Sequence, residues 1–255
     1  MNRDAKSSAP VVLTIAGFDP SGGSGIIADI RTIEMFGCSG VATITSVTFQ
    51  NAEKFLGALH QTAESVRCQI ESVVMQTEIA ALKIGMLPTV EVVREVARLI
   101  RELKLPAAVI DPVMQSTTGA TLMGDDAIEV FVTELLPLAR VVTPNIPEAE
   151  RLSAINIGNE EQMRQAAARI RTVGARAVLI KGGHHNINGT SVTDMLDDGG
   201  DITVFTAQRI AGAELHGSGC ILSSAIAAGL AKGMGLEDAA STANRFVTKA
   251  FQALR

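Results

Sequence analysis

The sequence predicts an α/β protein in which a mostly parallel β-sheet is covered by helices on both faces. Short apolar runs recur along the chain, and amphipathic segments with helical spacing separate most of them. Strands that alternate with helices form right-handed crossovers, which build a parallel sheet. The chain has 255 residues, of which 47% are hydrophobic, enough to bury a large core. We therefore expect a single domain over residues 1–255.

The first expected strand covers residues 11–17, a continuous apolar run that ends in Gly17. Such a run is typical of a strand buried on both faces of a sheet. Similar runs occupy residues 41–49, 80–84, 107–110, 140–143 and 177–180. Residues 190–196 and 202–206 flank the turn sequence Asp-Asp-Gly-Gly-Asp, which predicts a β-hairpin.

The expected helices follow the 3.6-residue spacing of their apolar side chains. The clearest cover residues 65–75, 89–103, 125–135 and 160–172. Two more segments, residues 217–232 and 236–254, close the chain and are joined by a Gly-Met-Gly sequence. With the strands, they complete a regular alternation.

Charge and composition exclude several classes of function. The 22 basic and 27 acidic residues give a net charge of −5, without a basic run that could neutralise a nucleic-acid backbone. The first ten residues lack the apolar core of a signal peptide, and no apolar stretch is long enough for a membrane span. We expect a cytoplasmic protein without a nucleic-acid or membrane partner. Three widely spaced cysteines fit neither a disulfide framework nor a zinc cluster.

Ligands of open α/β sheets bind outside the carboxyl ends of the strands, so the loops there are the candidate sites. The first such loop is glycine-rich, spans residues 17–25 and leads into a helix. It could bind a phosphate at the helix N-terminus, or it could be a packing device. Asp29, one turn into that helix, could bind a ligand or complement the helix dipole.

A second loop, His216-Gly217-Ser218-Gly219-Cys220, opens a helix rich in small residues. Backbone N–H groups of its glycines could converge on an anion, and we expect an anion hole here. Because Cys220 lies in the first turn, the helix dipole should lower its thiol pKa, although a buried inert cysteine is the alternative. For Cys38 and Cys68 we expect the inert, buried state.

Two further motifs follow strands at the same edge. Asn145 and Glu148, three residues apart, could bind hydrated Mg²⁺ and its phosphates, or could form only a helix capping box. Lys181, before two glycines, could supply a positive charge to a phosphate. Together with the anion hole, these residues indicate a phosphoryl-transfer site.

The set of motifs resembles the hydroxymethylpyrimidine/phosphomethylpyrimidine kinase family. The matching segments, spread over residues 11–253, are 16–25 with 28–29, 83–87, 111–114, 143–148, 181–184 and 216–220. The resemblance implies a ribokinase-like fold with a small β flap. It also implies ATP-dependent phosphorylation of 4-amino-5-hydroxymethyl-2-methylpyrimidine and of its monophosphate in thiamine biosynthesis, with ATP and Mg²⁺ as cofactors.

The same resemblance implies a role for each site residue. The pyrimidine would be bound by Gly17, Asp29, Gln50, Met86 and Val113. The amide of Gln50 can match the donor and acceptors of an aminopyrimidine, and Met86 and Val113 can form apolar walls. Phosphate and Mg-ATP would be bound by Gly217, Ser218, Gly219, Lys181, Asn145 and Glu148, with Glu148 reaching the metal through water.

Cys220 stands where many ribokinase-like enzymes carry an Asp base, and the resemblance implies that it faces the attacking hydroxyl. A weak base suffices because phosphoryl transfer has a loose transition state. Two other functions stay open: a pyridoxal or pyridoxine kinase, and a catalytically silent small-molecule binding protein. Relatives commonly form homodimers, and residues 41–49 are a candidate surface.

Overall fold

We describe a computed structural model of the chain, over residues 9–51, 54–116, 119–183, 191–208 and 216–252. The strands are β1 Val11–Phe18, β2 Ser39–Gln50, β3 Phe55–His60, β4 Ala81–Ile84, β5 Ala108–Ile110, β6 Ala139–Val142, β7 Ala177–Ile180, β8 Ser191–Asp198 and β9 Asp201–Gln208. The helices are α1 Gly25–Met35, α2 Ala63–Val74, α3 Val90–Glu102, α4 Asp125–Val130, α5 Ile146–Ser153, α6 Glu160–Thr172, α7 Ser218–Ala231 and α8 Leu236–Gln252.

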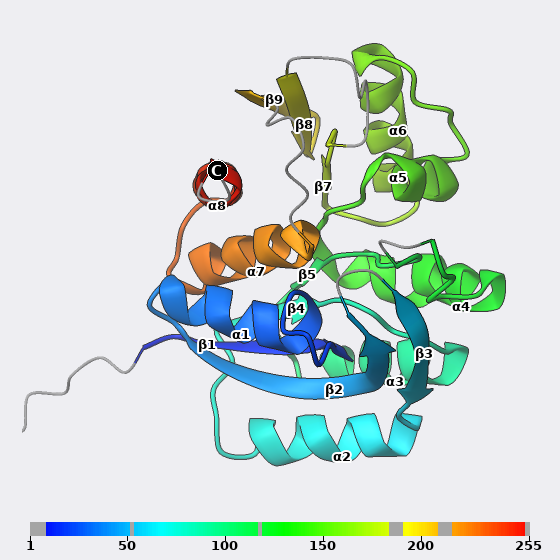
Figure 1. Ribbon diagram of the computed structural model, residues 1–255, viewed down its shortest axis with the longest axis vertical. Helices are drawn as coiled ribbons and strands as arrows, with labels where there is room; N and C mark the ends of the chain where they lie inside the picture. The colour runs from blue at the N-terminus through cyan, green and yellow to red at the C-terminus, as the bar shows by residue number, and fades with distance from the viewer. Residues whose placement is uncertain (1–8, 52–53, 117–118, 184–190, 209–215, 253–255) are drawn as a thin grey trace, which may run out of the picture.

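The strands of this part of the chain form one sheet in the order β3-β2-β1-β4-β5-β6-β7-β8-β9 (Figure 1). Six neighbouring strands are parallel: β2, β1, β4, β5, β6 and β7. Strands β3, β8 and β9 pair antiparallel at the two ends of the sheet. This confirms the mostly parallel sheet and the hairpin expected after residue 190. In the described part of the chain, no helix has the length and apolarity needed to cross a membrane.

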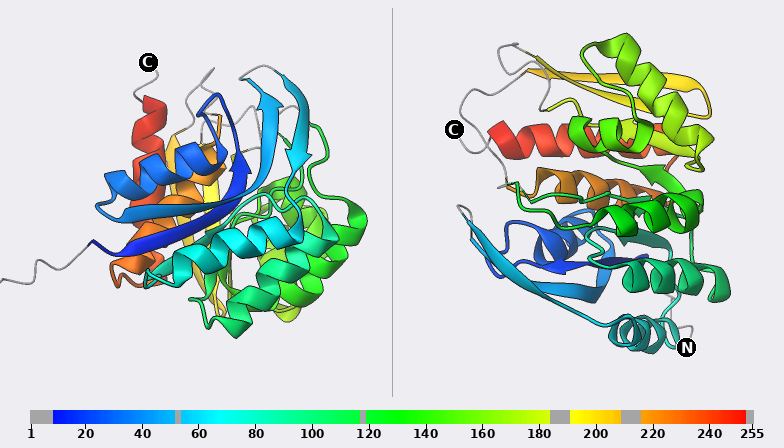
Figure 2. Two further views of the ribbon diagram at one scale, coloured as in Figure 1. Left: turned by 90° about the horizontal axis from the view of Figure 1, so that it is seen from below. Right: turned by 90° about the vertical axis from the view of Figure 1, so that its right-hand side faces the viewer.

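Each face of the sheet carries its own hydrophobic core (Figure 2). Helices α2 to α6 pack on one face, and α1, α7 and α8 pack on the other. Strand β1 supplies both cores by alternation, because Leu13 and Ile15 point to the first face and Val12 points to the second. A strand buried on both sides must be apolar throughout, which explains the continuous runs in the sequence.

Three elements differ from the sequence-based expectation. The helix expected at residues 125–135 is α4 followed by a π-helical turn, Phe131–Leu135, before Pro137. Strand β3 was not expected, because this edge strand is largely solvent-accessible and includes Gly57, so it has no clean apolar alternation. The segment 41–49 is only half buried, since the end of β2 extends past β1 and pairs only with the edge strand β3.

Strand order reverses on either side of β1, which places a topological switch point between β1 and β4. The chain leaves β1 through α1 to reach β2, and it crosses back through α2 to reach β4 (Figure 1). Loops at the carboxyl ends of β1 and β4 therefore diverge and open a crevice, the usual position for a ligand in this kind of sheet. Residues Asp19 and Gly85 begin those two loops.

Candidate active site

The glycine-rich loop after β1 is organised by Asp19, which is almost fully buried. Its carboxylate accepts hydrogen bonds from the backbone N–H and hydroxyl of both Ser21 and Ser24, at 2.7 to 3.0 Å. Burial raises the pKa of Asp19, but these bonds and one from His216 outweigh it and hold the pKa below its ordinary value. Gly25, at φ +58°, closes the loop on the Gly17 carbonyl, where a Cβ atom would overlap the oxygen. The loop is thus a rigid unit.

The second glycine-rich loop lies directly against the first. His216 Nε2 lies 3.1 Å from the Asp19 carboxylate. Gly217 adopts φ +78°, and a Cβ atom there would overlap the carbonyl oxygen of Gly23. Only glycine fits this contact. The packing of the two loops sets the position of the first turn of α7 at the switch point.

Helix α7 begins at Ser218 with its N-terminus free of side-chain caps and of acidic residues. The N–H groups of its first turn therefore have no intrahelical partner and can bind an anion. Gly219 faces Lys181, whose Nζ would lie 3.0 Å from a Cβ atom at residue 219. A positive side chain and a helix N-terminus thus face the same small space.

Lys181 follows β7 and is held by Asp111, which follows β5. The Lys181 Nζ lies 2.7 Å from Asp111 Oδ1, and Thr143 also donates to that oxygen at 3.3 Å. Burial lowers the pKa of Lys181, but the negative charges of Asp111 and Glu148 outweigh it and raise the pKa. Lys181 therefore keeps its charge at neutral pH.

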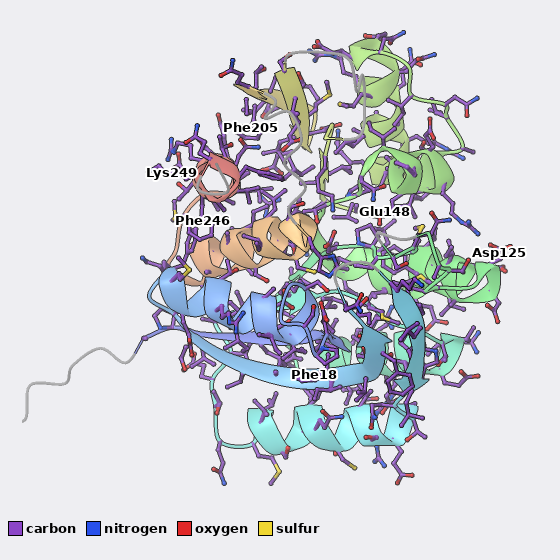
Figure 3. The ribbon with its side chains drawn as sticks, in the orientation of Figure 1. Phe18, Asp125, Glu148, Phe205, Phe246 and Lys249 are labelled. Atoms are coloured by element: carbon purple, nitrogen blue, oxygen red, sulfur yellow. The ribbon has the colours of Figure 1, made fainter. Side chains whose placement is uncertain are left out.

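Asn145 and Glu148 form a complete capping box at the start of α5, the alternative left open by the sequence. The Asn145 side chain accepts from the Glu148 N–H at 2.9 Å, and the Glu148 carboxylate accepts from the Asn145 N–H at 2.8 Å. Burial and nearby Asp111 raise the pKa of Glu148 to about 7, although Lys181 opposes this. Figure 3 labels Glu148 at this helix start, above α4. Its carboxylate is close enough to Asp111 for the two charges to interact.

Cys220 lies in the first turn of α7 as expected, but its predicted thiol pKa is wrong. Burial of the thiol raises its pKa to about 11, and the negative charges of Asp29 and Asp111 add to this. Lys83 and a backbone hydrogen bond at Gly25 oppose the shift. Desolvation therefore outweighs the Lys83 charge and the backbone hydrogen bond, and the resting thiol is protonated.

The other two cysteines differ from each other. Cys38 is buried, and its thiol lies 3.6 Å from the carbonyl oxygen of Ala228, as expected for an inert residue. Cys68 is exposed, so the prediction of burial is wrong. It lies on α2 between the buried residues Val66 and Ile70, and thus on the opposite side of that helix.

Asp29 is fully buried beneath the site, where we expected a substrate ligand or a helix-dipole partner. Its carboxylate accepts hydrogen bonds from Thr14 at 2.6 Å, from Lys83 at 2.7 and 2.8 Å, and from Ser224 at 2.8 Å. Both oxygens are thus engaged by protein groups. In this structure Asp29 supports the floor of the site, and a direct contact with a substrate stays a prediction.

Gly17 and Met86 meet at the crevice, on the side opposite Lys181. The sulfur of Met86 would lie 3.2 Å from a Cβ atom at residue 17, and the Met86 carbonyl accepts from Thr45 at 2.6 Å. The end of β2 and strand β3 form an antiparallel flap, and Gln50 is the last residue of β2 in it. Val113 follows β5, and both Gln50 and Val113 are partly exposed. The predicted pyrimidine residues therefore come from the flap and from three neighbouring strand ends.

Asp111 and Lys83 lie within segments that match the family, but no role was predicted for either residue. Asp111 comes directly after a buried strand, at the edge where the site was expected, and this position could have identified it. Lys83 sits inside an apolar strand, and a charged residue there is rare enough to attract attention. His60 is exposed at the end of β3, and its Nδ1 lies 3.0 Å from the Ser46 hydroxyl. His184 and His185 lie outside the described residues.

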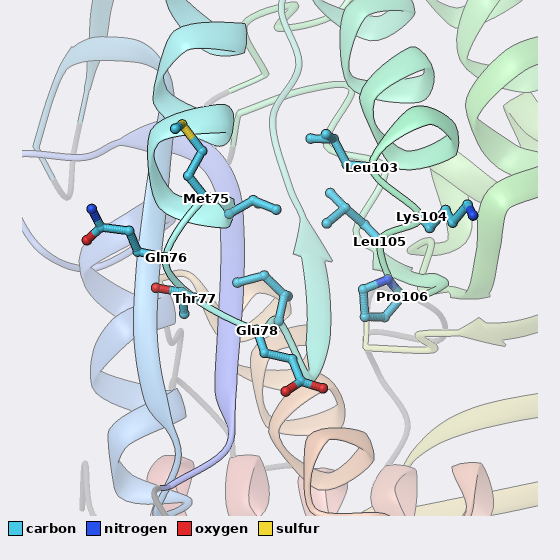
Figure 4. Close-up of a pocket in the computed structure, with 10 residues that line it drawn as sticks. Met75, Gln76, Thr77, Glu78, Leu103, Lys104, Leu105 and Pro106 are labelled. Atoms are coloured by element: carbon cyan, nitrogen blue, oxygen red, sulfur yellow. The ribbon is translucent and has the colours of Figure 1, made fainter.

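A surface pocket lies away from the candidate active site (Figure 4). It is lined by the loops that precede β4 and β5, including Met75 and Leu105. These loops are at the amino ends of the parallel strands, opposite to the site. Among the described residues, no group of three or more metal-ligating side chains occurs.

The fold and this site together define a kinase of the ribokinase-like class. Two solved structures show the likeness. Phosphomethylpyrimidine kinase of Clostridium difficile 630 has 34% identity and a TM-score of 0.83, over 94% of this chain and 99% of that one. Pyridoxal kinase of Staphylococcus aureus in complex with ADP has 30% identity and a TM-score of 0.87, over 96% and 88%.

The family model described as phosphomethylpyrimidine kinase matches residues 19–254, and the chain belongs to this family. The hydroxymethylpyrimidine/phosphomethylpyrimidine kinase of Streptomyces coelicolor is 42% identical over 96% of this chain and 89% of that protein. The thiamine biosynthesis bifunctional protein ThiED of Geobacter sulfurreducens is 41% identical over 98% of this chain, which spans only 51% of that protein. The sequence-based family assignment is confirmed.

Proposed function

We propose that the chain transfers phosphate from ATP to hydroxymethylpyrimidine and then to its monophosphate, a function in thiamine biosynthesis. The observation that carries this proposal is that Lys181 faces the start of α7, which carries Cys220 in its first turn, at the strand ends where Gly17 and Met86 also meet. A phosphate donor and a small acceptor can thus meet at one strand edge. The names of the relatives supply the acceptor class.

The transferred phosphate would be bound by the N–H groups of Gly217, Ser218 and Gly219 together with Lys181. These donors are preorganised, so they can stabilise charge that develops in a loose transition state without reorganisation. Cys220 would contact the attacking hydroxyl. Because its thiol is protonated at rest, Cys220 would orient the hydroxyl without taking its proton. That proton would leave late, to an oxygen of the transferred phosphate, as the hydroxyl oxygen bonds to phosphorus.

Mg²⁺ fits the donor set on chemical grounds. Mg²⁺ keeps several waters and binds through one or two carboxylates plus substrate phosphates, so a cluster of three protein ligands is not required. Glu148 and Asp111 offer two neighbouring carboxylates beside Lys181. Glu148, with Asn145, would hold the hydrated ion, and the charge of that ion would offset the charge of the phosphates when Mg-ATP is bound. A divalent cation would also favour the ionised form of Glu148.

The pyrimidine would lie between the flap and the β4 loop. Gln50 would bind the aminopyrimidine edge through its amide, and Met86 and Val113 would contact the ring faces. Gly17 would allow the ring to approach the backbone. Asp29 would contact the substrate as predicted, and through its bonds to Lys83 and Ser224 it would also support the floor of the site.

The experiment that tests the proposal offers Mg-ATP with hydroxymethylpyrimidine, its monophosphate and pyridoxal in parallel, and resolves the products by mass. Formation of the pyrimidine diphosphate is the expected result. Pyridoxal phosphate alone would instead assign the chain to vitamin B6 metabolism, a candidate that the fold of the Staphylococcus aureus pyridoxal kinase supports. No transfer to any acceptor would favour a silent binding protein.

We also propose a cytoplasmic homodimer. The flap leaves Phe49, Leu56 and Leu59 exposed on β2 and β3, and these apolar side chains together can bury surface against a second copy. β3 is also a sheet edge, whose free backbone groups favour pairing. Light scattering should show a dimer for the wild type and a monomer for the double variant Leu56→Lys/Leu59→Lys.

A further inference from the structure

Lys83 is a lysine with no solvent exposure, located on the central strand β4. Its Nζ lies 2.8 and 2.7 Å from the two carboxylate oxygens of Asp29, on α1. Burial alone would lower the pKa of Lys83, but Asp29, Cys220 and Asp111 outweigh it and raise the pKa. The desolvation of a buried charged pair can exceed its Coulombic gain, so burial of the pair is weak evidence of a purely stabilising role.

The Asp29 carboxylate ties three further elements to Lys83. Thr14 on β1 donates to it at 2.6 Å, and Ser224 on α7 donates at 2.8 Å. Ser224 lies four residues after Cys220, so both side chains are on the same face of α7. The network thus anchors the helix whose first turn carries the anion hole and Cys220.

The ammonium group also lies directly below the acceptor side of the site. A Cβ atom at Gly85 would be 3.0 Å from Lys83 Nζ, and Gly85 precedes Met86 of the predicted pyrimidine pocket. Four charged groups face the region of Cys220: Lys83 from β4, Asp29 from α1, Asp111 after β5 and Lys181 after β7. Asp111 and Lys181 have proposed roles at the metal and the phosphate, whereas Lys83 and Asp29 have neither of these roles.

We propose that Lys83 is a positioning residue, which with Asp29 and Ser224 holds the start of α7 and sets the electrostatic potential at the Cys220 thiol. The inference deepens the proposed function and rests on it for the reaction itself. The two charges of the pair act on the thiol with opposite sign: the Lys83 cation favours a thiolate, and the Asp29 carboxylate opposes it. Residues that only fill space would not change the ionisation of the thiol in opposite directions.

The test measures how fast iodoacetamide alkylates Cys220 at pH 9, read by mass on the peptide that contains it, so that Cys68 does not interfere. Because the thiolate is the reacting species, we expect Asp29→Asn to speed alkylation and Lys83→Met to slow it, each by about threefold, or about half a pKa unit. A shift of both variants in the same direction, as loosening of the structure would cause, or no shift in either, overturns the proposal.

If Lys83→Met does not fold, Lys83→Met/Asp29→Asn is compared with Asp29→Asn, since the double variant leaves no unpaired buried charge. Slower alkylation in the double variant is expected, and an equal or faster rate overturns the proposal. Arg171→Met is the control: it breaks the ion pair with Asp197, 2.9 Å apart and remote from α7, and should leave alkylation unchanged.

Turnover is measured on the same variants. Ser224→Ala should lower kcat about threefold to tenfold with little change in the KM for Mg-ATP, because it loosens the turn that carries Cys220 and not the nucleotide contacts. A higher KM for Mg-ATP with unchanged kcat contradicts the positioning role. Alkylation needs no substrate, so its outcome is independent of whether the proposed phosphorylation is correct.

Discussion

At the scale of single residues, the site uses polar groups whose buried surroundings control their charge. Asp19 is held ionised by hydrogen bonds from Ser21, Ser24 and His216, whereas Glu148 and Asp194 are pushed toward their neutral forms by burial. Cys220 shows the same competition, and there desolvation outweighs the charge of Lys83 and a backbone hydrogen bond. The number of donors and nearby cations decides the direction in each case.

Replacement of Cys220 by alanine should lower kcat by about 100-fold, with little change in the KM for the pyrimidine, because the thiol orients the hydroxyl and does not bind the ring. Steady-state kinetics with saturating Mg-ATP measure both constants. Cys220→Ser, which keeps a hydroxyl donor and acceptor, should recover part of the loss. Unchanged turnover in Cys220→Ala would remove the role proposed for the thiol.

Asp194 on β8 should make the protein less stable as pH rises. It accepts from the Gly182 N–H at 2.9 Å and from Asn244 at 2.7 Å, yet burial raises its pKa to about 6 from 3.8. The folded state therefore binds the extra proton, and this stabilisation is lost as pH rises from about 4 to about 6. Urea unfolding of Asp194→Asn should show a gain over wild type of roughly 2 kcal/mol between pH 4 and pH 7.

The same residue supports the site through the backbone. The N–H of Gly182 follows Lys181, so Asp194 fixes the turn that aims the lysine. Asn at 194 can keep this bond if the Asn244 amide reverses, and kcat should then be retained. A stability difference that does not vary with pH would contradict the assignment of this titration to Asp194.

At the scale of elements, the site depends on the packing of two glycine-rich loops at the ends of β1 and before α7. Gly217 adopts φ +78°, and a side chain there would overlap Gly23. Gly233, after α7, adopts φ +81° with nothing within 4 Å of a Cβ atom. The two glycines thus share a backbone conformation and differ in their surroundings.

Gly217→Ala should therefore reduce kcat by at least about tenfold, because it displaces the anion hole, while Gly233→Ala should leave kcat unchanged. Both variants carry the cost of a left-handed conformation, about 1 kcal/mol. Kinetics together with thermal unfolding separate the two effects. Equal loss of activity in both would show that strain, and not the loop contact, controls catalysis.

At the scale of the whole molecule, one ligand site joins segments far apart in the chain. Five charged or thiol residues come from five strand ends or helix starts, and the sheet order brings their elements together: Asp19, Lys83, Asp111, Lys181 and Cys220. The unfolded chain has no such site, so a nucleotide that binds there stabilises only the folded state.

Mg-ADP at about 100 times its Kd should add about 2.7 kcal/mol of stability, which raises Tm by about 5–10 °C for a domain of this size. Differential scanning fluorimetry measures the shift. EDTA should remove most of it, and Lys181→Ala should reduce it strongly. A full shift in Lys181→Ala would place the nucleotide elsewhere.

The sequence by itself determined the sheet, because strands buried on both faces have to be apolar throughout, and it determined the order of the site motifs at the strand ends. It also determined the family, through several motifs in one order. It could not reveal β3, since an exposed edge strand carries no clean alternation.

Only the tertiary structure decided the charge states and partners in the site. The cost of removing a group from water depends on every neighbour from distant segments, as the raised pKa of Cys220 and the complete burial of Asp29 show. Lys83 is the sharpest case, because its strand appears in the sequence as a buried one, but Asp29 on α1 and Cys220 on α7, which act on its charge, are 54 and 137 positions away in the chain. Long-range packing set these partners, and no local pattern encodes them.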